Sequence, residues 1–67
     1  MATYKQLIDG LNILSRYSDE GMDSTVCAEH DIIYASPGQH VLLGDCRLLE
    51  ELGWHFDEDA GCWARFV

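Results

Sequence analysis

The sequence contains few cationic residues. Its 67 residues include four lysines and arginines against twelve aspartates and glutamates, so the formal net charge at pH 7 is −8. A protein of this charge repels nucleic acid and anionic membranes and is attracted to basic partners. We therefore expect no direct contact with nucleic acid and no membrane partner. The acidity also has an ordinary explanation, because net charge keeps a small protein soluble.

Long hydrophobic runs are absent as well. The longest cover residues 32–35 and 41–43, whereas a membrane-spanning helix needs about 20 apolar residues. The beginning of the chain is interrupted by Lys5, Asp9 and Gly10, so it lacks the apolar centre of a signal peptide. We expect a cytoplasmic protein.

Proline and cysteine are scarce. With one proline and 48% hydrophobic residues, the composition is not that of a disordered chain, and the length predicts one domain over residues 1–67. The three cysteines, Cys27, Cys46 and Cys62, contain no Cys-x-x-Cys pair. Because a disulfide framework in so short a chain normally has an even number of cysteines, we expect reduced, partly buried thiols.

Motifs for catalysis or metal binding are missing. Cys27 and His30 have a spacing seen in metal sites, but residues three apart on a strand point to opposite faces and cannot hold one ion. Asp57, Glu58 and Asp59 lack the glycine and terminal glutamate of a calcium loop. There is no glycine-rich phosphate loop, and a domain this small seldom encloses a catalytic pocket. We expect no metal, no cofactor and no enzymatic activity.

Residues 3–18 have the periodicity of an amphipathic helix. Apolar side chains recur at three- and four-residue spacing and form one stripe: Tyr4, Leu7, Ile8, Leu11 and Leu14. Thr3 followed by Gln6 matches a capping box, and Gly21 suits the end of this segment. Gly10 costs about 1 kcal/mol relative to alanine inside a helix, which indicates either a close crossing by another segment or a weak helix.

The middle of the chain predicts one strand and a second helix. Residues 26–35 predict a single strand on which Glu29 and Asp31 share one face, and residues 36–39 predict a turn. Residues 40–43 are compatible with a short strand or with the entry to a helix. Asp45 suits the cap of a short helix over residues 46–52. We expect this helix to point Leu48, Leu49 and Leu52 inward.

Residues 53–67 predict a β-hairpin. Two aromatic-rich runs flank Asp59-Ala60-Gly61, which suits a three-residue loop with glycine in the left-handed conformation. This loop pairs Phe56 with Ala64 and Asp57 with Trp63. The resulting core face contains Trp54, Phe56, Cys62, Ala64 and Phe66. The opposite face contains His55, Asp57, Trp63 and Arg65.

Together these elements predict an α+β fold. An N-terminal amphipathic helix and a short second helix pack on a three-stranded antiparallel sheet that ends in the C-terminal hairpin. The other sheet face is then exposed and acidic around Trp63, and tryptophan is common at binding hot spots. We predict that a partner binds the following residues: Glu29, Asp31, His55, Asp57, Glu58, Asp59, Trp63 and Arg65.

This site predicts an interaction protein, in one of two forms. In the first, the carboxylates occupy a basic, nucleic-acid-binding surface of a protein or nucleoprotein complex and block it as a DNA mimic. In the second, a non-inhibitory accessory or regulatory domain binds its partner through the sheet face, and the acidity serves only solubility. A dimeric transcriptional or antitoxin-like regulator is a third interpretation, although the few cations disfavour direct contact with DNA.

Two stretches carry a resemblance to known proteins. They are Glu29-His30-Asp31-Ile32-Ile33-Tyr34 and the closing stretch from Leu52-Gly53-Trp54 through Asp57-Glu58-Asp59 to Trp63. In size, charge and layout the chain resembles small acidic proteins of phages and mobile elements, among which anti-CRISPR proteins are the best-known functional group. Those proteins share no common motif, so the resemblance assigns no residue. It implies an inhibitor that blocks target-DNA binding by a CRISPR surveillance complex in the host cell cytoplasm.

Overall fold

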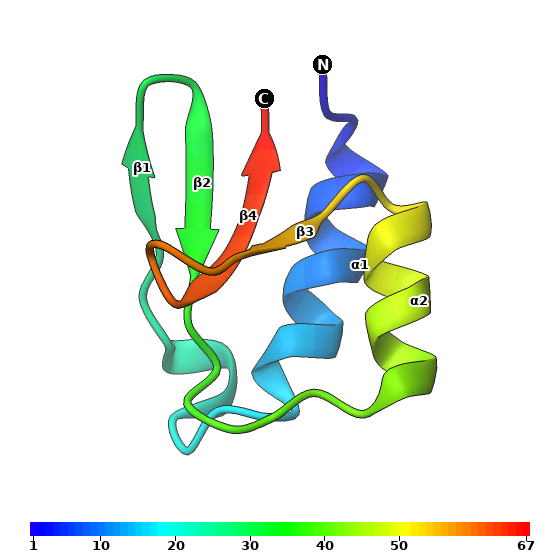
Figure 1. Ribbon diagram of the computed structural model, residues 1–67, viewed down its shortest axis with the longest axis vertical. Helices are drawn as coiled ribbons and strands as arrows, with labels where there is room; N and C mark the ends of the chain where they lie inside the picture. Colours follow the sequence, from blue (N-terminus) through cyan, green and yellow to red (C-terminus); the bar gives the residue numbers. More distant parts are fainter.

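Two helices lie side by side against one face of a four-stranded antiparallel sheet in the computed structural model, which describes residues 1–67 (Figure 1). The elements in chain order are α1 (Tyr4–Ser15), the 3-10 helix η1 (Gly21–Asp23), β1 (Cys27–Glu29), β2 (Ile32–Ala35), α2 (Leu43–Glu51), β3 (His55–Asp57) and β4 (Cys62–Phe66). The spatial order of the strands is β1-β2-β4-β3. The α+β prediction is therefore confirmed, and the sheet has one strand more than expected. Neither helix has the length and apolarity that crossing a membrane requires.

Helix α1 begins at the predicted capping box. The side chain of Thr3 accepts a hydrogen bond from the backbone N–H of Gln6 at 3.1 Å, and the Gln6 side chain accepts one from the backbone N–H of Thr3 at 2.9 Å. The helix ends at Ser15, earlier than predicted. Its buried face holds Ile13 and Leu14, while Tyr4 and Ile8 of the predicted stripe are exposed. The buried face is thus rotated away from these two side chains.

The single strand predicted over residues 26–35 is wrong. The segment instead folds into the hairpin β1–β2, with Glu29 opposite Ile32 and Cys27 opposite Tyr34. His30 and Asp31 form its two-residue loop, and both have positive φ angles, 50° and 65°. Positive φ at both central residues is typical of tight hairpin turns that match the twist of the strands. Asp31 therefore lies in a turn and does not share a strand face with Glu29.

The predicted C-terminal hairpin is present as β3–β4, but its register differs by one residue. Asp57 pairs with Cys62, and Phe56 pairs with Trp63. The loop has one residue more than expected because Gly61, with φ of 70°, donates its N–H to the carbonyl of Asp57 at 2.7 Å. Since side chains alternate along a strand, this slip turns every side chain of β4 to the opposite face.

Helix α2 begins at Leu43, three residues before the predicted start. Asp45 therefore lies in the first turn instead of at the cap, where its carboxylate accepts a hydrogen bond from the Tyr17 hydroxyl. Leu49 is fully buried, as expected, whereas Leu48 is about half exposed. The helix thus reaches the core mainly through Leu49.

The core lies between the helices and the sheet. It contains Ile13, Leu14, Ala35, Leu49, Trp54 and Trp63. Trp54 is 1% exposed, and its indole N–H donates to the Gln6 carbonyl at 3.2 Å. The prediction that Trp63 and Arg65 face solvent is wrong, because the register slip turns them toward the helices. Phe66, predicted in the core, is exposed for the same reason.

Arg65 is buried without a carboxylate partner. Its guanidinium donates to the carbonyl of Leu52 at 3.0 Å, to the carbonyl of Phe66 at 2.7 Å and to the side-chain oxygen of Gln6 at 2.9 Å. Leu52 is the C-terminal cap of α2, where the helix dipole favours a positive charge. Arg65 therefore joins the end of α2, the start of α1 and strand β4.

Candidate interaction surface

The sheet face that the helices leave uncovered is called the open face below. The register places every second side chain of each strand on it. The open face consists of Cys27 and Glu29 on β1, Ile32 and Tyr34 on β2, Cys62, Ala64 and Phe66 on β4, and His55 and Asp57 on β3. It is therefore built from four strands, with aromatic and aliphatic side chains at its centre.

The middle of the open face contains small side chains that larger neighbouring side chains cover. Ala64 lies opposite Tyr34 on one side and opposite His55 on the other. It is completely buried, and Cys62 beside it is 8% exposed, although no helix packs over them. The larger neighbours cover the small ones, because directly opposite side chains in a sheet are close together. The open face thus presents the larger side chains to solvent.

The most exposed apolar group of the open face is Phe66. Its side chain is 56% exposed, and it lies opposite the half-buried Ile32 of β2. The ring of His55 stacks on the ring of Phe66 with a centroid distance of 5.6 Å and an interplanar angle of 21°. Stacking restricts both rings before any partner arrives, which lowers the entropic cost of binding.

Carboxylates on the two edge strands of the open face raise the pKa of groups at its centre. Burial is the main cause that raises the pKa of the Tyr34 hydroxyl, and the charges of Asp57 on β3 and Glu29 on β1 raise it further. Burial also raises the pKa of the Cys62 thiol, again with a contribution from Asp57. An apolar centre thus lies between negative charges contributed by opposite edges of the sheet.

No lysine or arginine belongs to the open face. Lys5 on α1 pairs with Asp9 at 2.6 Å, and Arg16 lies 3.9 Å from the carboxylate of Asp45. Arg65 is buried on the helix side of the sheet, and Arg47 lies on α2. The carboxylates of the open face are therefore not balanced by neighbouring cations, apart from a contact of 3.4 Å between Glu29 and His30.

The predicted site residues fall into three groups. Glu29, His55 and Asp57 share the open face. Asp31, Glu58 and Asp59 are exposed in the two hairpin loops, at opposite ends of the sheet. Trp63 and Arg65 are buried on the helix side. Ile32, Tyr34 and Phe66 also belong to the open face but were not among the predicted site residues. Phe66 was predicted on the core face of the hairpin, and a loop one residue longer would have placed it on the open face.

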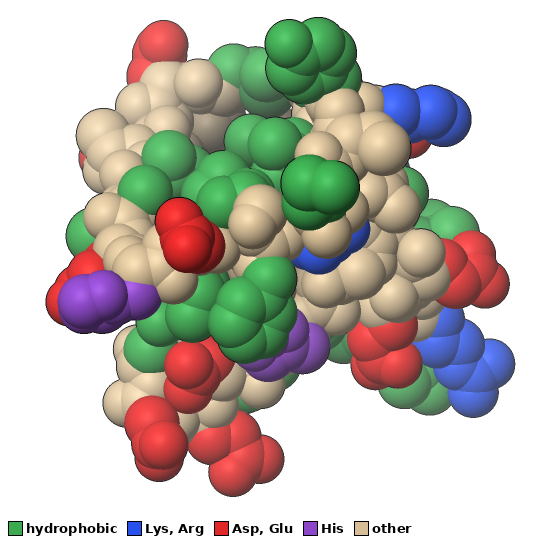
Figure 2. Space-filling model, turned by 90° about the horizontal axis from the view of Figure 1, so that it is seen from above, with side chains coloured by type: hydrophobic (Ala, Val, Ile, Leu, Met, Phe, Trp, Pro, Cys, Tyr) green, Lys and Arg blue, Asp and Glu red, His purple; other side chains and the backbone are tan.

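Acidic side chains are spread over several elements. Besides those at the sheet, Asp19, Glu20 and Asp23 lie in or before η1, and Glu50 and Glu51 lie on α2. Figure 2 shows the end of the molecule where both chain termini lie, with hydrophobic side chains in the middle, one carboxylate among them and the other carboxylates at separate places toward the edge. The negative charge at this end is therefore interspersed with apolar surface and does not form one continuous acidic patch.

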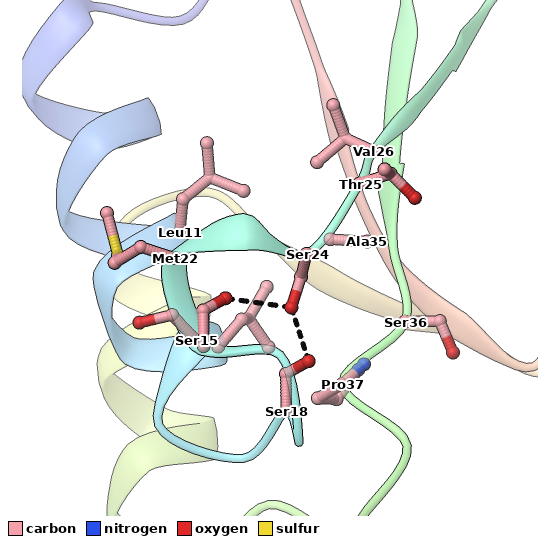
Figure 3. Close-up of a pocket in the computed structure, with 12 residues that line it drawn as sticks. Leu11, Ser15, Ser18, Met22, Ser24, Thr25, Val26, Ala35, Ser36 and Pro37 are labelled. Carbon is pink, nitrogen blue, oxygen red and sulfur yellow. Dashed lines mark hydrogen bonds between the residues drawn. The ribbon is translucent and has the colours of Figure 1, made fainter.

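Two hollows flank the sheet, and the smaller one lies between α1, η1 and the start of β1 (Figure 3). It has a volume of about 240 Å³, and no titratable side chain lines it. The hydroxyl of Ser24 bonds with that of Ser18 and donates to the Gly21 carbonyl at 2.8 Å (Figure 3). These two hydroxyls hold the loop together, and no histidine, cysteine or carboxylate lines the hollow beside its other hydroxyl groups.

The larger hollow is a groove of about 620 Å³, called the hairpin groove below, and it shares Ser36 and Pro37 with the smaller hollow. The following segments line it: residues 36–41, helix α2 and the hairpin β3–β4. Trp63 and Phe56 form part of its wall, and their rings contact edge to face at a centroid distance of 5.8 Å. The predicted site residue Trp63 thus reaches a surface depression, although it does not lie on the open face.

The cysteines and histidines do not converge. No three side chains of histidine, cysteine, aspartate or glutamate lie close enough together to hold a metal ion. The three cysteines are free, with Cys27 exposed, Cys46 half-buried and Cys62 buried. No protein-family model matches the chain, and neither a curated protein nor a solved structure matches it. The geometry and charge of the open face are therefore the features that bear on function.

Proposed function

We propose that this protein is a small acidic interaction protein that binds a basic protein surface through the open face. One observation carries the proposal: an exposed ring pair, Phe66 and His55, lies between the carboxylates of Glu29 and Asp57 with no cation on the same face. An exposed apolar patch with a polar rim is typical of interaction sites in soluble proteins. The partner places an apolar side chain on Phe66 and lysine or arginine side chains at the rim.

The net charge supports a basic partner. Of the four lysines and arginines, Lys5 and Arg16 are next to carboxylates and Arg65 is buried. The potential around the molecule is therefore negative, and it accelerates the encounter with a positive surface. The apolar centre then supplies the part of the binding energy that does not depend on salt.

A narrower form of the proposal is a DNA-mimic inhibitor. Asp31 in the β1–β2 turn and Glu58 and Asp59 in the β3–β4 loop extend the negative charge of the open face toward both ends of the sheet. In this form the partner is a nucleic-acid-binding protein or nucleoprotein complex, and the carboxylates take the place of phosphates. A CRISPR surveillance complex is such a partner, and only the resemblance in size, charge and layout supports it.

The alternative is an accessory or regulatory domain that binds its partner by the aromatic centre of the open face, with the acidity serving solubility. The stacked pair of Phe66 and His55 favours this alternative as much as it favours the inhibitor. Electrostatic attraction dominates the affinity of the inhibitor, whereas apolar contact dominates the affinity of the accessory domain. The dependence of the affinity on ionic strength therefore distinguishes the two functions.

The test starts from a partner that has been captured with the whole protein, identified and purified. Its dissociation constant is measured with the wild type and with Phe66→Ala, Glu29→Gln and Asp57→Asn. We expect Phe66→Ala to weaken binding about 30-fold, which is the range of a hot-spot truncation. The matched control is Tyr4→Ala, which removes an exposed aromatic side chain of α1 and is expected to leave the affinity unchanged. Equal losses in both variants would contradict a role for the open face.

Salt dependence and competition by nucleic acid, measured on the same complex, distinguish the inhibitor from the accessory domain. For an inhibitor of the DNA-mimic kind, affinity falls steeply between about 50 and 200 mM salt, and nucleic acid competes with the protein for its partner. For an accessory domain, the affinity changes little with salt and nucleic acid does not compete. Either result assigns the protein to one class.

A further inference from the structure

The hairpin groove is a second exposed depression with a mixed apolar and acidic lining. Its walls include Val41 and Leu43 on one side and Phe56 and Trp63 on the other. Leu43 is 69% exposed and Phe56 is 51% exposed, so apolar surface is accessible from solvent at this site. Both tryptophans are core residues, but only Trp63, which is 5% exposed, lines this groove.

The hairpin groove is lined by one carboxylate, that of Glu50, and by one histidine, His40. Glu50 of α2 is a lining residue, and no lysine or arginine lines the groove. The carboxylate of Glu50 has no ion-pair partner within the chain. The turn residue Gly61 also lines the groove, and it follows the acidic loop residues Glu58 and Asp59 in the sequence. The carboxylate of Glu50 thus lies at the wall of an apolar floor, and the groove reaches the end of the acidic β3–β4 loop at Gly61.

We propose that the hairpin groove binds a short basic peptide segment that inserts one large aliphatic side chain next to lysine residues. The aliphatic side chain is buried against Phe56 and Trp63, and the lysines lie near Glu50 and the β3–β4 loop. Charge complementarity selects this occupant: an acidic or neutral segment gains nothing from the rim, whereas a purely basic one leaves the apolar floor exposed. The groove lies on the helix side of the sheet, so this proposal stands apart from the open face.

The probe is the acetylated and amidated pentapeptide Lys-Lys-Leu-Lys-Lys. Its matched controls replace the leucine by alanine, or all four lysines by glutamate. Binding is followed by the fluorescence of Trp63 and by amide chemical shifts of the whole protein. We expect the shift changes to be concentrated at residues 41–46, 50 and 56–63. The alanine peptide is expected to bind about tenfold more weakly, since one buried leucine is worth about one factor of ten or more.

Variants of two adjacent glutamates give a matched comparison. Glu50 lines the hairpin groove, while Glu51 lines a different depression between α1 and α2. Both are exposed, and the same charge reversal in each changes the net charge equally. We expect Glu50→Lys to weaken binding of the leucine peptide about fivefold, Glu50→Gln to weaken it less, and Glu51→Lys and Phe66→Ala to leave it unchanged.

Several outcomes would overturn the proposal. They are equal binding of the leucine and alanine peptides, shift changes spread over all acidic surfaces, equal effects of Glu50→Lys and Glu51→Lys, or no binding of the leucine peptide at millimolar concentration. None of these outcomes bears on the affinity of the open face for its own partner, which Phe66→Ala tests separately.

Discussion

Gly10 and Trp54 are in direct contact, and no side chain larger than hydrogen fits between them. A β carbon on Gly10 would lie 2.1 Å from the indole nitrogen of Trp54, far inside van der Waals contact. The indole is held in place because its N–H donates to the carbonyl of Gln6 at 3.2 Å. Gly10 is therefore the point where Trp54, in the segment between α2 and β3, packs against α1.

Replacing Gly10 with alanine is expected to destabilise the protein. Helix propensity favours alanine by about 1 kcal/mol, but the buried indole has no space to move, and overpacking of this kind costs about 1–3 kcal/mol or more. We expect a net loss of about 2 kcal/mol in the free energy of unfolding, measured by urea denaturation. The control is Gly44→Ala in α2, where a β carbon meets nothing within 4 Å. It should raise stability by up to about 1 kcal/mol, and a loss at Gly44 equal to that at Gly10 would contradict the account.

Arg65 is expected to be essential for stability although it contacts no carboxylate. Arg65→Met removes the side-chain donor to the carbonyl of Leu52 and one of the two donors to the side-chain oxygen of Gln6, and an unsatisfied buried group costs about 1–3 kcal/mol. We expect a loss of about 3 kcal/mol, and Arg65→Lys should recover only part of it, because one ammonium does not span three acceptors. Arg47→Met, on the exposed side of α2, should change stability by no more than about 0.5 kcal/mol. Thermal and urea unfolding measure the stability of all three variants.

Asp57 has a structural role that is separable from its charge. Its side-chain oxygen accepts hydrogen bonds from the backbone N–H groups of Asp59 at 3.0 Å and Ala60 at 3.1 Å. Asparagine keeps an acceptor oxygen at this position, so Asp57→Asn should change stability by less than about 0.5 kcal/mol, whereas Asp57→Ala should cost about 1 kcal/mol. If the two variants are equally unstable, the loop depends on charge and not on these hydrogen bonds.

Stability is expected to fall at alkaline pH. The hydrogen bond to Asp45 is the main cause that raises the pKa of the Tyr17 hydroxyl in the folded protein above its ordinary value of 10.0, and burial raises the pKa of the Cys62 thiol above 9.0. Burial and nearby carboxylates do the same for Tyr34. Since the unfolded chain loses these protons first, the contribution of these three groups to stability is fully present below about pH 9 and is lost as pH rises through the folded pKa values.

Urea midpoints between pH 7 and 11 check this dependence. Tyr17→Phe should lower the midpoint at pH 7, because the bond to Asp45 is lost, and should flatten part of the alkaline fall. A midpoint that rises toward pH 11 would show that these groups do not have raised pKa values in the folded protein.

Local patterns predicted several parts of the fold correctly. Thr3 and Gln6 form the capping box because both hydrogen bonds join residues three apart and need no tertiary contact. Gly10 indicated either a close crossing or a weak helix, and its contact with Trp54 shows that the first alternative holds. The C-terminal hairpin was also evident, because a glycine between two aromatic-rich runs requires a turn.

The predictions for the C-terminal hairpin that were wrong differ from the structure by one residue in strand register. The sequence around Asp57-Glu58-Asp59-Ala60-Gly61 suits a loop of three or four residues, and the longer loop is selected by the side chain of Asp57 and by the burial of Trp63. That choice moved Trp63 and Arg65 into the core and Phe66 to the surface. Similarly, His30-Asp31 has no glycine to mark a turn, so the periodicity of residues 26–35 resembled a single strand.

The affinity of the identified partner for Phe66→Ala, compared with Tyr4→Ala, tests the central claim most directly. If the open face is the binding surface, the Phe66 variant unfolds at the same urea concentration as the wild type within about 0.5 M and binds its partner about 30-fold more weakly. The Tyr4 variant then binds like the wild type. Unchanged affinity of a folded Phe66 variant would contradict the account.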